Sequence, residues 1–384
     1  MKRLLAATLV AVYFAILASP AANMALGWIK EPPLAGVTTP VTRPALTISG
    51  LAKERFQKGY VAWFEANYGL RGTAVRLDSS LDYYAFHEAP AESRVRVGSQ
   101  GVLYVDEDVD YYNRLAPPAD PAFDAVAAHV ARAQALLRAH GKSLVPVLTP
   151  AKTSLFPSEV PTAWRRELGE PRPTEQVYRA LVRALNAAGV LFVDGRTLLE
   201  TEQTKQRVGM FTQRGRHWNA LAACLVMADA TRVAKALAPG RAFTEPDCSW
   251  TETTSLTIKS PEVDLLQLLN VWQVGPLPDA APAMTRRTVA SEQAPSALFV
   301  GTSFVFAIVA ESDRDGLFRD NLVYYYNQTV LGPVGTPGHP VEPMSASWRE
   351  QTLARDVFIF EIPEWYLPFV TTDFLDQVEA VVGK

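Results

Sequence analysis

The chain has 384 residues, of which 48% are hydrophobic and 20% are charged, and its formal net charge at pH 7 is −3. This length and apolar content can bury a sizeable core, and they favour one large α/β domain with appendages. The slightly acidic balance and the lack of a long basic run exclude a nucleic-acid footprint, so we expect no nucleic-acid partner.

The N-terminus has the composition of a targeting segment. Lys2 and Arg3 precede a run from Leu4 to Ile29 without any charged residue. The basic start places the N-terminus in the cytoplasm, which predicts export of the rest of the chain. Residues 1–29 are therefore a signal anchor or a signal peptide. The run can span a bilayer, for which ~20 residues suffice, and Ser19-Pro20-Ala21 offers a small-residue cleavage site.

Residues 30–50 are predicted to be a linker, because prolines among Thr and Gly favour extended, poorly packed backbone. From residue 51 to residue 384 the pattern becomes that of a folded domain. Its first part is predicted to contain two helices and a β-hairpin, over residues 56–68, 75–86 and 94–105.

Strands and helices alternate in the remainder of the chain. Near-continuous apolar runs predict strands at 143–149, 190–194, 298–300, 322–326 and 357–360, and longer periodic segments predict helices at 121–140, 175–188 and 220–237. This alternation is typical of a parallel sheet covered on both faces, with ligands at the carboxyl ends of the strands. Residues 244–294, with scattered prolines and one apolar run at 265–274, are interpreted as an insertion that could shape the cleft.

Two polar residues are expected at this edge of the sheet. Lys152 follows the strand at 143–149, where its ammonium could contact a substrate carbonyl or anion, although a lysine in such a loop is more often solvated. Asp194 ends the next strand, where an aspartate often caps the following helix, predicted at 197–202.

His217 is the best candidate for a general base among the five histidines. It lies in Arg216-His217-Trp218-Asn219, directly before the helix at 220–237. The other four, His87, His129, His140 and His339, occupy positions more natural for structural or solvated roles. A neutral imidazole is the usual base for a serine hydroxyl, but a histidine in this position taken alone is more often an ordinary loop histidine.

The segment from Ala297 to Phe306 supplies the candidate nucleophile. An apolar strand stops at Gly301-Thr302-Ser303, and an apolar segment resumes at once. Gly301 allows a sharp turn that leaves the Ser303 hydroxyl at the mouth of the sheet, where backbone N–H groups of the next helix can hold an oxyanion. A serine that merely caps the helix is the alternative.

Cys224 and Cys248 are the only cysteines. A disulfide between them is allowed in an exported protein, although Cys224 also falls on a predicted helix where a buried thiol would be ordinary. No Cys/His spacing indicates a zinc site, and we expect neither a metal nor a cofactor.

The order of His217-Trp218 and Gly301-Thr302-Ser303-Phe304, together with the segments 97–104 and 356–367, resembles the alginate O-acetyltransferase family, the AlgJ/AlgX-like proteins with an SGNH-hydrolase-like domain. The resemblance runs from about residue 51 to the C-terminus. It implies an α/β, three-layer parallel-sheet domain, circularly permuted relative to ordinary SGNH hydrolases. It further implies Ser303 as nucleophile, His217 as base, and an N-terminal segment that remains as a membrane anchor.

The chain departs from the family pattern Asp-x-His-Trp, because Gly215 occupies the position of the acid. A backbone carbonyl, a carboxylate from another strand end, or nothing must then orient His217. Asp194 and Glu361 are the acids whose predicted strand ends lie at the right edge of the sheet.

The expected function is extracytoplasmic O-acyl transfer, with acetyl as the acyl group, or ester hydrolysis, on an exported polysaccharide through an acyl-Ser intermediate. The resemblance implies the polysaccharide substrate and a membrane-embedded acyltransferase partner that delivers acetyl. We expect the protein in the periplasm or otherwise outside the cytoplasm, anchored in the inner membrane. The alternative is a catalytically idle scaffold or carbohydrate-binding subunit of a polysaccharide-acetylating complex, which the missing Asp favours.

Overall fold

The computed structural model describes residues 2–36, 40–91, 93–115, 121–253, 262–272, 280–285, 288, 290–332, 337–367 and 372–383. Parts of the predicted linker and of the predicted insertion, including residues 273–274 of its apolar run, lie outside these residues. The chain forms two compact units, one of Met1–Val95 with Leu266–Val274 and the other of Arg96–Leu265 with Gly275–Lys384. The unit that contains the sheet begins near residue 96.

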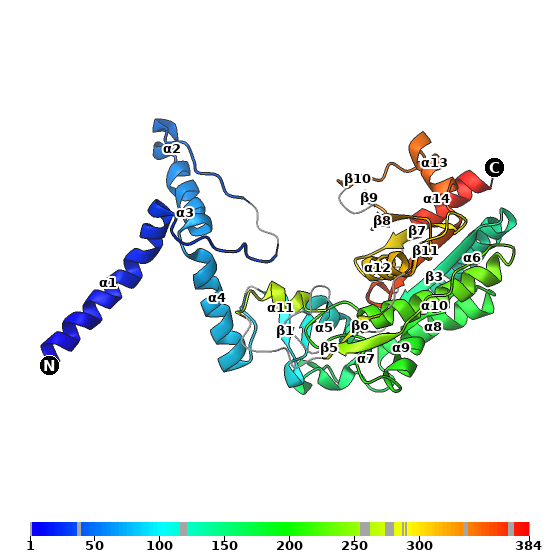
Figure 1. The fold of residues 1–384 in the computed structure, drawn as a ribbon, viewed down its shortest axis with the longest axis horizontal. Coiled ribbons are helices and arrows are strands. Elements are labelled where there is room, and N and C mark those ends of the chain that lie inside the picture. The colour runs from blue at the N-terminus through cyan, green and yellow to red at the C-terminus, as the bar shows by residue number, and fades with distance from the viewer. Residues whose placement is uncertain are drawn as a thin grey trace. The chain divides into compact units, whose positions relative to one another are not determined.

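The first unit is helical, and its N-terminal helices are coloured blue to light blue in Figure 1. Its helices are α1 (Lys2–Leu26), α2 (Ile48–Ala52), α3 (Arg55–Asn67) and α4 (Arg71–Leu81), and α4 continues into a π-helical turn at Asp82–Phe86. The side chains of α1 are solvent-exposed, and the helix is long and apolar enough to cross a membrane, a property that signal sequences share. A later stretch of the chain joins this unit, since the Trp272 backbone N–H donates to Ser80 Oγ (2.9 Å) and the Tyr84 hydroxyl donates to the Trp272 carbonyl (2.9 Å).

The second unit holds most strands and the remaining helices. Its helices are α5 (Asp106–Tyr112), α6 (Pro121–Ala139), α7 (Lys152–Leu155), α8 (Pro173–Ala187), α9 (Gly195–Gln203), α10 (Ala220–Leu237), α12 (Val305–Asp315), α13 (Ala346–Leu353) and α14 (Asp373–Val382), and α11 (Asp264–Leu268) begins in it. Short 3₁₀ turns occur at Ser99–Gly101, Pro157–Glu159, Thr162–Trp164 and Glu364–Tyr366.

A seven-stranded sheet forms the centre of the second unit, in the order β10-β9-β8-β7-β11-β3-β4. Its strands are β3 (Ser143–Thr149), β4 (Val193–Asp194), β7 (Ser296–Gly301), β8 (Asp320–Tyr325), β9 (Thr329–Leu331), β10 (His339–Pro340) and β11 (Val357–Pro363). Five neighbouring strands of this sheet, β8, β7, β11, β3 and β4, are parallel. At one edge, β9 pairs antiparallel with β8, and β10 pairs antiparallel with β9. The predicted parallel sheet is confirmed, while the strand predicted at 190–194 is shortened to its last two residues.

Two smaller sheets accompany the central one. β1 (Val95–Val97) and β2 (Leu103–Val105) form the pair predicted at 94–105, and β5 (Trp250–Thr253) pairs antiparallel with β6 (Ala281–Met284) inside the predicted insertion.

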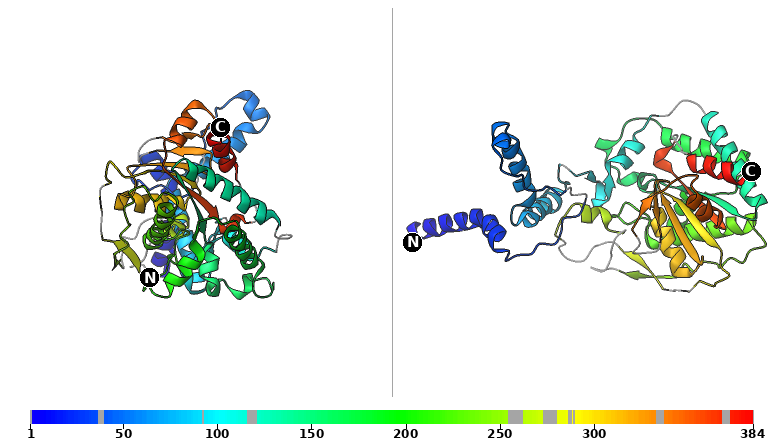
Figure 2. Two further views of the ribbon diagram at one scale, coloured as in Figure 1. Left: turned by 90° about the vertical axis from the view of Figure 1, so that its right-hand side faces the viewer. Right: turned by 90° about the horizontal axis from the view of Figure 1, so that it is seen from above.

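Helices cover both faces of the central sheet (Figure 2). Alternate residues of each strand point to opposite faces, so that Val145 and Val147 of β3 pack in a core with α10 and α12, whereas Leu144 and Leu148 pack in a second core with α6, α8 and α14. One core therefore lies on each face of the sheet. The sheet and the helices on its two faces form the three layers that the alternation of strands and helices predicts. The strands between them are buried on both sides, which explains their near-continuous apolar sequence.

The two cysteines form a disulfide. Cys224 is fully buried in α10 and is bonded to Cys248, with the Cα atoms 5.7 Å apart. The bond ties the N-terminal part of α10 to the segment that leads into β5. A disulfide is expected in an oxidising compartment and rarely persists in the cytosol.

Removing this disulfide should lower stability, because a cross-link over 24 residues restricts the unfolded chain. We expect the Cys224→Ser/Cys248→Ser double variant to lose about 3 kcal/mol of unfolding free energy. Urea titrations of both proteins, with and without reductant, measure this difference. Equal midpoints for the oxidised wild type and the double variant would contradict the expectation, and reductant should shift only the wild type.

Candidate active site

Ser303 lies in the turn between β7 and α12, at the carboxyl edge of the sheet, as the sequence predicts. The strand ends at Gly301, where the backbone passes very close to the neighbouring strand β11. A Cβ atom at Gly301 would lie 2.3 Å from Oε2 of Glu361 and 2.7 Å from the side chain of Val305. Only glycine permits this approach, so Gly301 serves close packing under the nucleophile.

Glu361 supports this turn from below. Its Oε2 accepts a hydrogen bond from the Thr302 backbone N–H at 2.6 Å, and both of its carboxyl oxygens lie within 3.1 Å of the Thr302 hydroxyl. Burial raises the pKa of Glu361 to about 7, against the lowering effect of the Thr302 N–H bond. Glu361 therefore fixes the residue before Ser303. It does not occupy the place predicted for it beside the imidazole.

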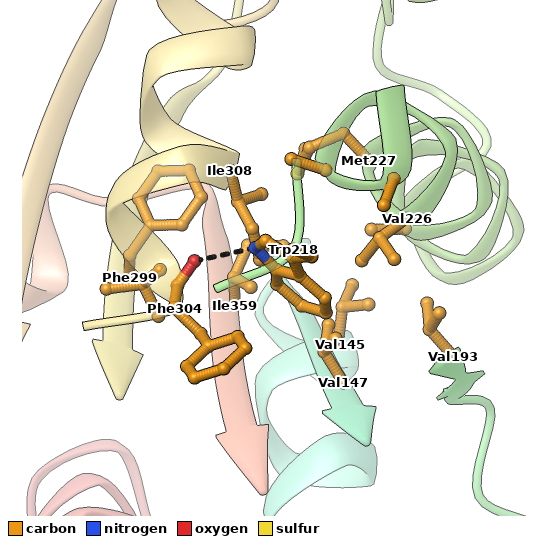
Figure 3. Close-up of a cluster of buried hydrophobic side chains, with 14 of the residues drawn as sticks. Val145, Val147, Val193, Trp218, Val226, Met227, Phe299, Phe304, Ile308 and Ile359 are labelled. Atoms are coloured by element: carbon orange, nitrogen blue, oxygen red, sulfur yellow. Dashed lines mark hydrogen bonds between the residues drawn. The ribbon is translucent and has the colours of Figure 1, made fainter. Parts of the chain in front are cut away.

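His217 and Ser303 are brought together, with Nε2 of His217 2.7 Å from Oγ of Ser303. The residues that follow each of them lock this placement. Nε1 of Trp218 donates to the Phe304 carbonyl at 3.1 Å, and the two rings pack edge to face at 5.4 Å (Figure 3). Both side chains are almost completely buried. The pairs His-Trp and Ser-Phe thus act as one packed unit.

Lys152 holds the loop before His217. Its side chain is 1% exposed, and Nζ donates to the carbonyls of Leu103 (2.7 Å), Gln213 (2.9 Å) and Gly215 (2.6 Å). An ammonium bound in this way lies inside the protein and away from the pocket, which corrects the expectation that Lys152 contacts substrate. A buried charge needs such partners, because it has lost those that water provides.

The acid beside the imidazole is Asp264, the first residue of α11. Its Oδ2 lies 2.7 Å from Nδ1 of His217, and its Oδ1 accepts from the backbone N–H groups of Arg216 (2.7 Å) and Leu265 (2.9 Å). Both oxygens are therefore engaged, which fixes the carboxylate toward the ring. Asp264 lies 47 positions after His217 in the sequence, yet its carboxylate contacts the imidazole. It therefore takes the place of the acid that is missing at Gly215.

Asp194, the other acid predicted for this role, caps a helix instead. It accepts from the Thr197 backbone N–H at 3.0 Å at the start of α9 and from the hydroxyl of Tyr178. Sequence reasoning missed Asp264 because it lies in the region 244–294, where no strand pattern fixes its position. The available signal was an aspartate immediately before the apolar run at 265–274, the position from which an acid can start a helix.

A pocket of about 390 Å³ opens beside the three residues. Its lining comes from the loop before α10, from the start of α11 and from one face of α12: His217, Ala220, Glu262, Asp264, Ser303, Phe306, Ala307, Ala310 and Glu311. Burial raises the pKa of Glu311 to about 7, although Arg314 opposes this effect by donating to its Oε2 at 2.6 Å. Burial also raises the pKa of Glu262.

This arrangement has the geometry that nucleophilic catalysis requires: a hydroxyl bonded to an imidazole, and an imidazole bonded to a carboxylate. The helix α12 starts beside the hydroxyl, so the positive end of its dipole lies near the pocket edge where charge would develop. The backbone N–H groups of Val305 and Phe306 themselves donate to the carbonyls of Thr302 and Ser303. Among the residues that the structure describes, no group of three His, Cys, Asp or Glu side chains could hold a metal ion.

A family model for the SGNH hydrolase-like domain of the acetyltransferase AlgX matches residues 95–364. The chain belongs to this family. The match covers more than half of the chain and includes Ser303, His217 and Asp264. The family resemblance inferred from the short motifs is thereby confirmed, and so is the SGNH-hydrolase-like fold class with its N-terminal apolar helix.

Several solved structures are similar to this AlgX-family chain. The O-acetyltransferase domain of AlgJ from Pseudomonas putida is 18% identical, with 74% of this chain and 98% of that chain covered and a TM-score of 0.44. AlgX from Pseudomonas aeruginosa is 13% identical, with 76% and 65% covered and a TM-score of 0.41. PatB1 from Bacillus cereus is 10% identical, with 70% and 95% covered and a TM-score of 0.43. No curated protein matches the chain.

The position of Asp264 predicts which carboxylate matters for reactivity. In a serine protease, loss of the triad acid lowers turnover by ~10⁴ because the imidazole is no longer held in the correct tautomer, so we expect Asp264→Asn to lose roughly 10³- to 10⁴-fold in hydrolysis of p-nitrophenyl acetate. Asp194→Asn is the matched control. Asparagine caps helices as well as aspartate does, so this variant should keep wild-type activity. Initial rates of the purified proteins decide between the two acids, and a larger loss in Asp194→Asn than in Asp264→Asn would exclude Asp264 from the role.

Proposed function

We propose that the protein is an O-acetyltransferase of polysaccharides that works through an acetyl-Ser intermediate at Ser303. The observation that carries the proposal is the continuous pair of 2.7 Å hydrogen bonds from Ser303 through His217 to Asp264. Membership of the AlgX family supports acetyl as the group transferred and a polysaccharide as the substrate.

In the first half-reaction, Oγ of Ser303 attacks the carbonyl carbon of an acetyl donor while Nε2 of His217 takes its proton. Asp264 stabilises the resulting imidazolium through Nδ1–H. The positive end of the α12 dipole, which lies beside Ser303, stabilises the oxyanion of the tetrahedral intermediate. Collapse of this intermediate breaks the bond to the donor's leaving group, which takes the proton from His217, and leaves acetyl on Ser303.

In the second half-reaction a hydroxyl of the sugar attacks the acetyl-Ser carbonyl. His217 removes the proton of that hydroxyl and then returns a proton to Oγ of Ser303 as the ester bond to the enzyme breaks. Water can replace the sugar, which gives hydrolysis of the donor. The balance between transfer and hydrolysis depends on how well the pocket holds the sugar relative to water.

The donor system and the location follow from the same proposal. A membrane-embedded acyltransferase would supply acetyl from the cytoplasmic side, and the chain would act outside the cytoplasm while attached to the inner membrane. The N-terminal apolar helix and the Cys224–Cys248 disulfide support this location, since disulfides persist in oxidising compartments. The alternative of an idle scaffold rested on the missing Asp at Gly215, and Asp264 removes that ground.

Labelling tests the acetyl-enzyme directly. Brief exposure to p-nitrophenyl acetate should add one acetyl group to Ser303, detectable by peptide mass spectrometry, because an activated ester acylates faster than water removes the acetyl group. Ser303→Ala and His217→Ala should lose both the label and the hydrolysis. Ser158→Ala, which changes an exposed serine outside the pocket, is the matched control. If Ser303→Ala is labelled and hydrolyses the ester at the wild-type rate, the enzyme proposal fails.

The proposed location has its own test. Protease added to spheroplasts should degrade the globular part, and the protein should stay with the membrane fraction after an alkaline wash, because an apolar helix of this length anchors strongly. A cytoplasmic protein serves as the protected control. Protection of the protein while a known external protein is cut would reverse the topology, and release by the wash would favour a cleaved signal peptide.

A further inference from the structure

A row of aromatic side chains lies across the carboxyl ends of β7, β8 and β11, next to Ser303. We call it the aromatic platform, and it consists of Phe306, Tyr325, Tyr326 and Tyr366. The rings of Phe306 and Tyr325 are 5.3 Å apart and inclined by 32°, and those of Tyr325 and Tyr326 are 4.5 Å apart. Because Phe306 also lines the pocket that contains Ser303, the platform begins at the nucleophile.

The platform exposes apolar surface that the fold could have buried. Phe306 is 40% exposed, Tyr326 41% and Tyr366 42%, whereas Phe304 and Trp365, the immediate neighbours of two of them, are buried. Exposed aromatic rings that adjoin one another beside a pocket are typical of a ligand-binding surface. The exposure is therefore best explained by contact with a ligand that reaches Ser303.

The backbone at Tyr326 is strained in a way that displays its ring. Tyr326 and Asn327 both have φ of 52°, and the Gln328 N–H donates to the Tyr325 carbonyl at 3.0 Å, which makes a tight turn between β8 and β9. Both central positions of such a turn favour Gly or Asn, and a bulky residue there costs free energy. Strain of this kind is typical of functional sites.

The hydroxyl groups complete a surface of mixed character. Burial raises the pKa of the Tyr326 hydroxyl above its usual range, and the nearby hydroxyls of Tyr366 and Tyr325 add to this effect, so the three polar tips lie close together. Tyrosine offers an apolar ring with a polar tip and loses little conformational entropy on binding. A pyranose ring has the complementary form, with C–H groups on its face and hydroxyls on its rim.

The pocket beside the platform disfavours negative charge. Its lining includes the carboxyl groups of Asp264, Glu262 and Glu311, and none of the lining residues that the structure describes is Lys or Arg. Arg314 is paired with Glu311 and Asp315. A uronate carboxylate placed here would find no lysine or arginine among the described lining residues, and a carboxylate without a cationic partner in a partly buried site costs binding free energy.

We infer that the aromatic platform is the acceptor subsite, and that it stacks against pyranose rings of a glycan that carries no carboxylate groups. The inference rests on the proposed function and extends it by naming the class of acceptor. Neutral and amino-bearing glycans share the required C–H faces, and the carboxylates of the pocket favour either of them over a polyuronate.

Binding is measured without turnover by using the full-length protein with Ser303→Ala, held in detergent micelles. Calorimetric titrations compare three hexasaccharides: cellohexaose as the neutral probe, a β-1,4-linked glucosamine hexamer as the amino probe, and a mannuronate hexamer as the acidic probe. We expect at least one of the first two to bind, and the mannuronate hexamer to bind about tenfold or more weakly, a difference of about 1.4 kcal/mol.

Single substitutions in the same background assign the binding to the platform. Tyr366→Ala and Tyr326→Asn should each weaken binding by about 2- to 10-fold, the worth of one aromatic contact. Asparagine tolerates positive φ, so Tyr326→Asn removes the ring without lowering the melting temperature, which separates lost binding from lost folding. Leu191→Ala, an apolar residue 40% exposed beside β4, is the matched control and should bind as the parent does.

The proposal is overturned if neither the neutral nor the amino hexamer binds, if the mannuronate hexamer binds most tightly, or if Tyr326→Asn and Tyr366→Ala bind like Leu191→Ala. Because this assay does not need a reactive Ser303, binding can hold while labelling of Ser303 fails. That combination would keep the subsite and reject the acetyltransferase.

Discussion

The contact between Trp218 and Phe304 is the constraint on which the site depends. Each of these residues directly follows a reactive one, and their hydrogen bond and edge-to-face packing join two loops that lie 86 residues apart in sequence. Because both side chains are buried in the core beneath the sheet edge, His217 and Ser303 cannot separate without opening that core. The 2.7 Å distance between His217 Nε2 and Ser303 Oγ is therefore fixed by the apolar packing of the residues that follow them.

Two buried ionisable side chains hold the backbone of the same loops. Glu361 engages Thr302 beneath the nucleophile, and Lys152 engages carbonyls of the loop that leads to His217. A hydrogen bond to a charged group such as the Lys152 ammonium contributes about 1.5–3 kcal/mol, and loss of one partner from any of these bonds leaves the other unsatisfied in the interior. Residues that a sequence places at the edge of a sheet can thus serve the active site by supporting its backbone, without touching a substrate.

The sequence was sufficient for the sheet and for two of the three reactive residues, because each of these follows from a strong local pattern. The apolar runs of β3, β7, β8 and β11 are buried on both faces, and such strands are visible by composition alone. Ser303 and His217 stand beside a strand end and a helix start, where spacing fixes their place. The roles of Asp264 and Lys152 do not follow from a local pattern. The role of Asp264 depends on how a long insertion folds back, and that of Lys152 depends on the side of the loop to which its side chain turns. Neither property is encoded in spacing.

Gly215 shows how such a role can move along a chain. The acid is absent from the position that the family pattern assigns, and yet a carboxylate sits against Nδ1 of His217, delivered by a different segment and held by the backbone N–H of Arg216. The imidazole requires a carboxylate oxygen beside Nδ1, and a residue from another segment of the chain can supply it. A chain of this family that lacks the Asp-x-His-Trp aspartate should therefore not be classed as a pseudoenzyme until the surroundings of its imidazole are known.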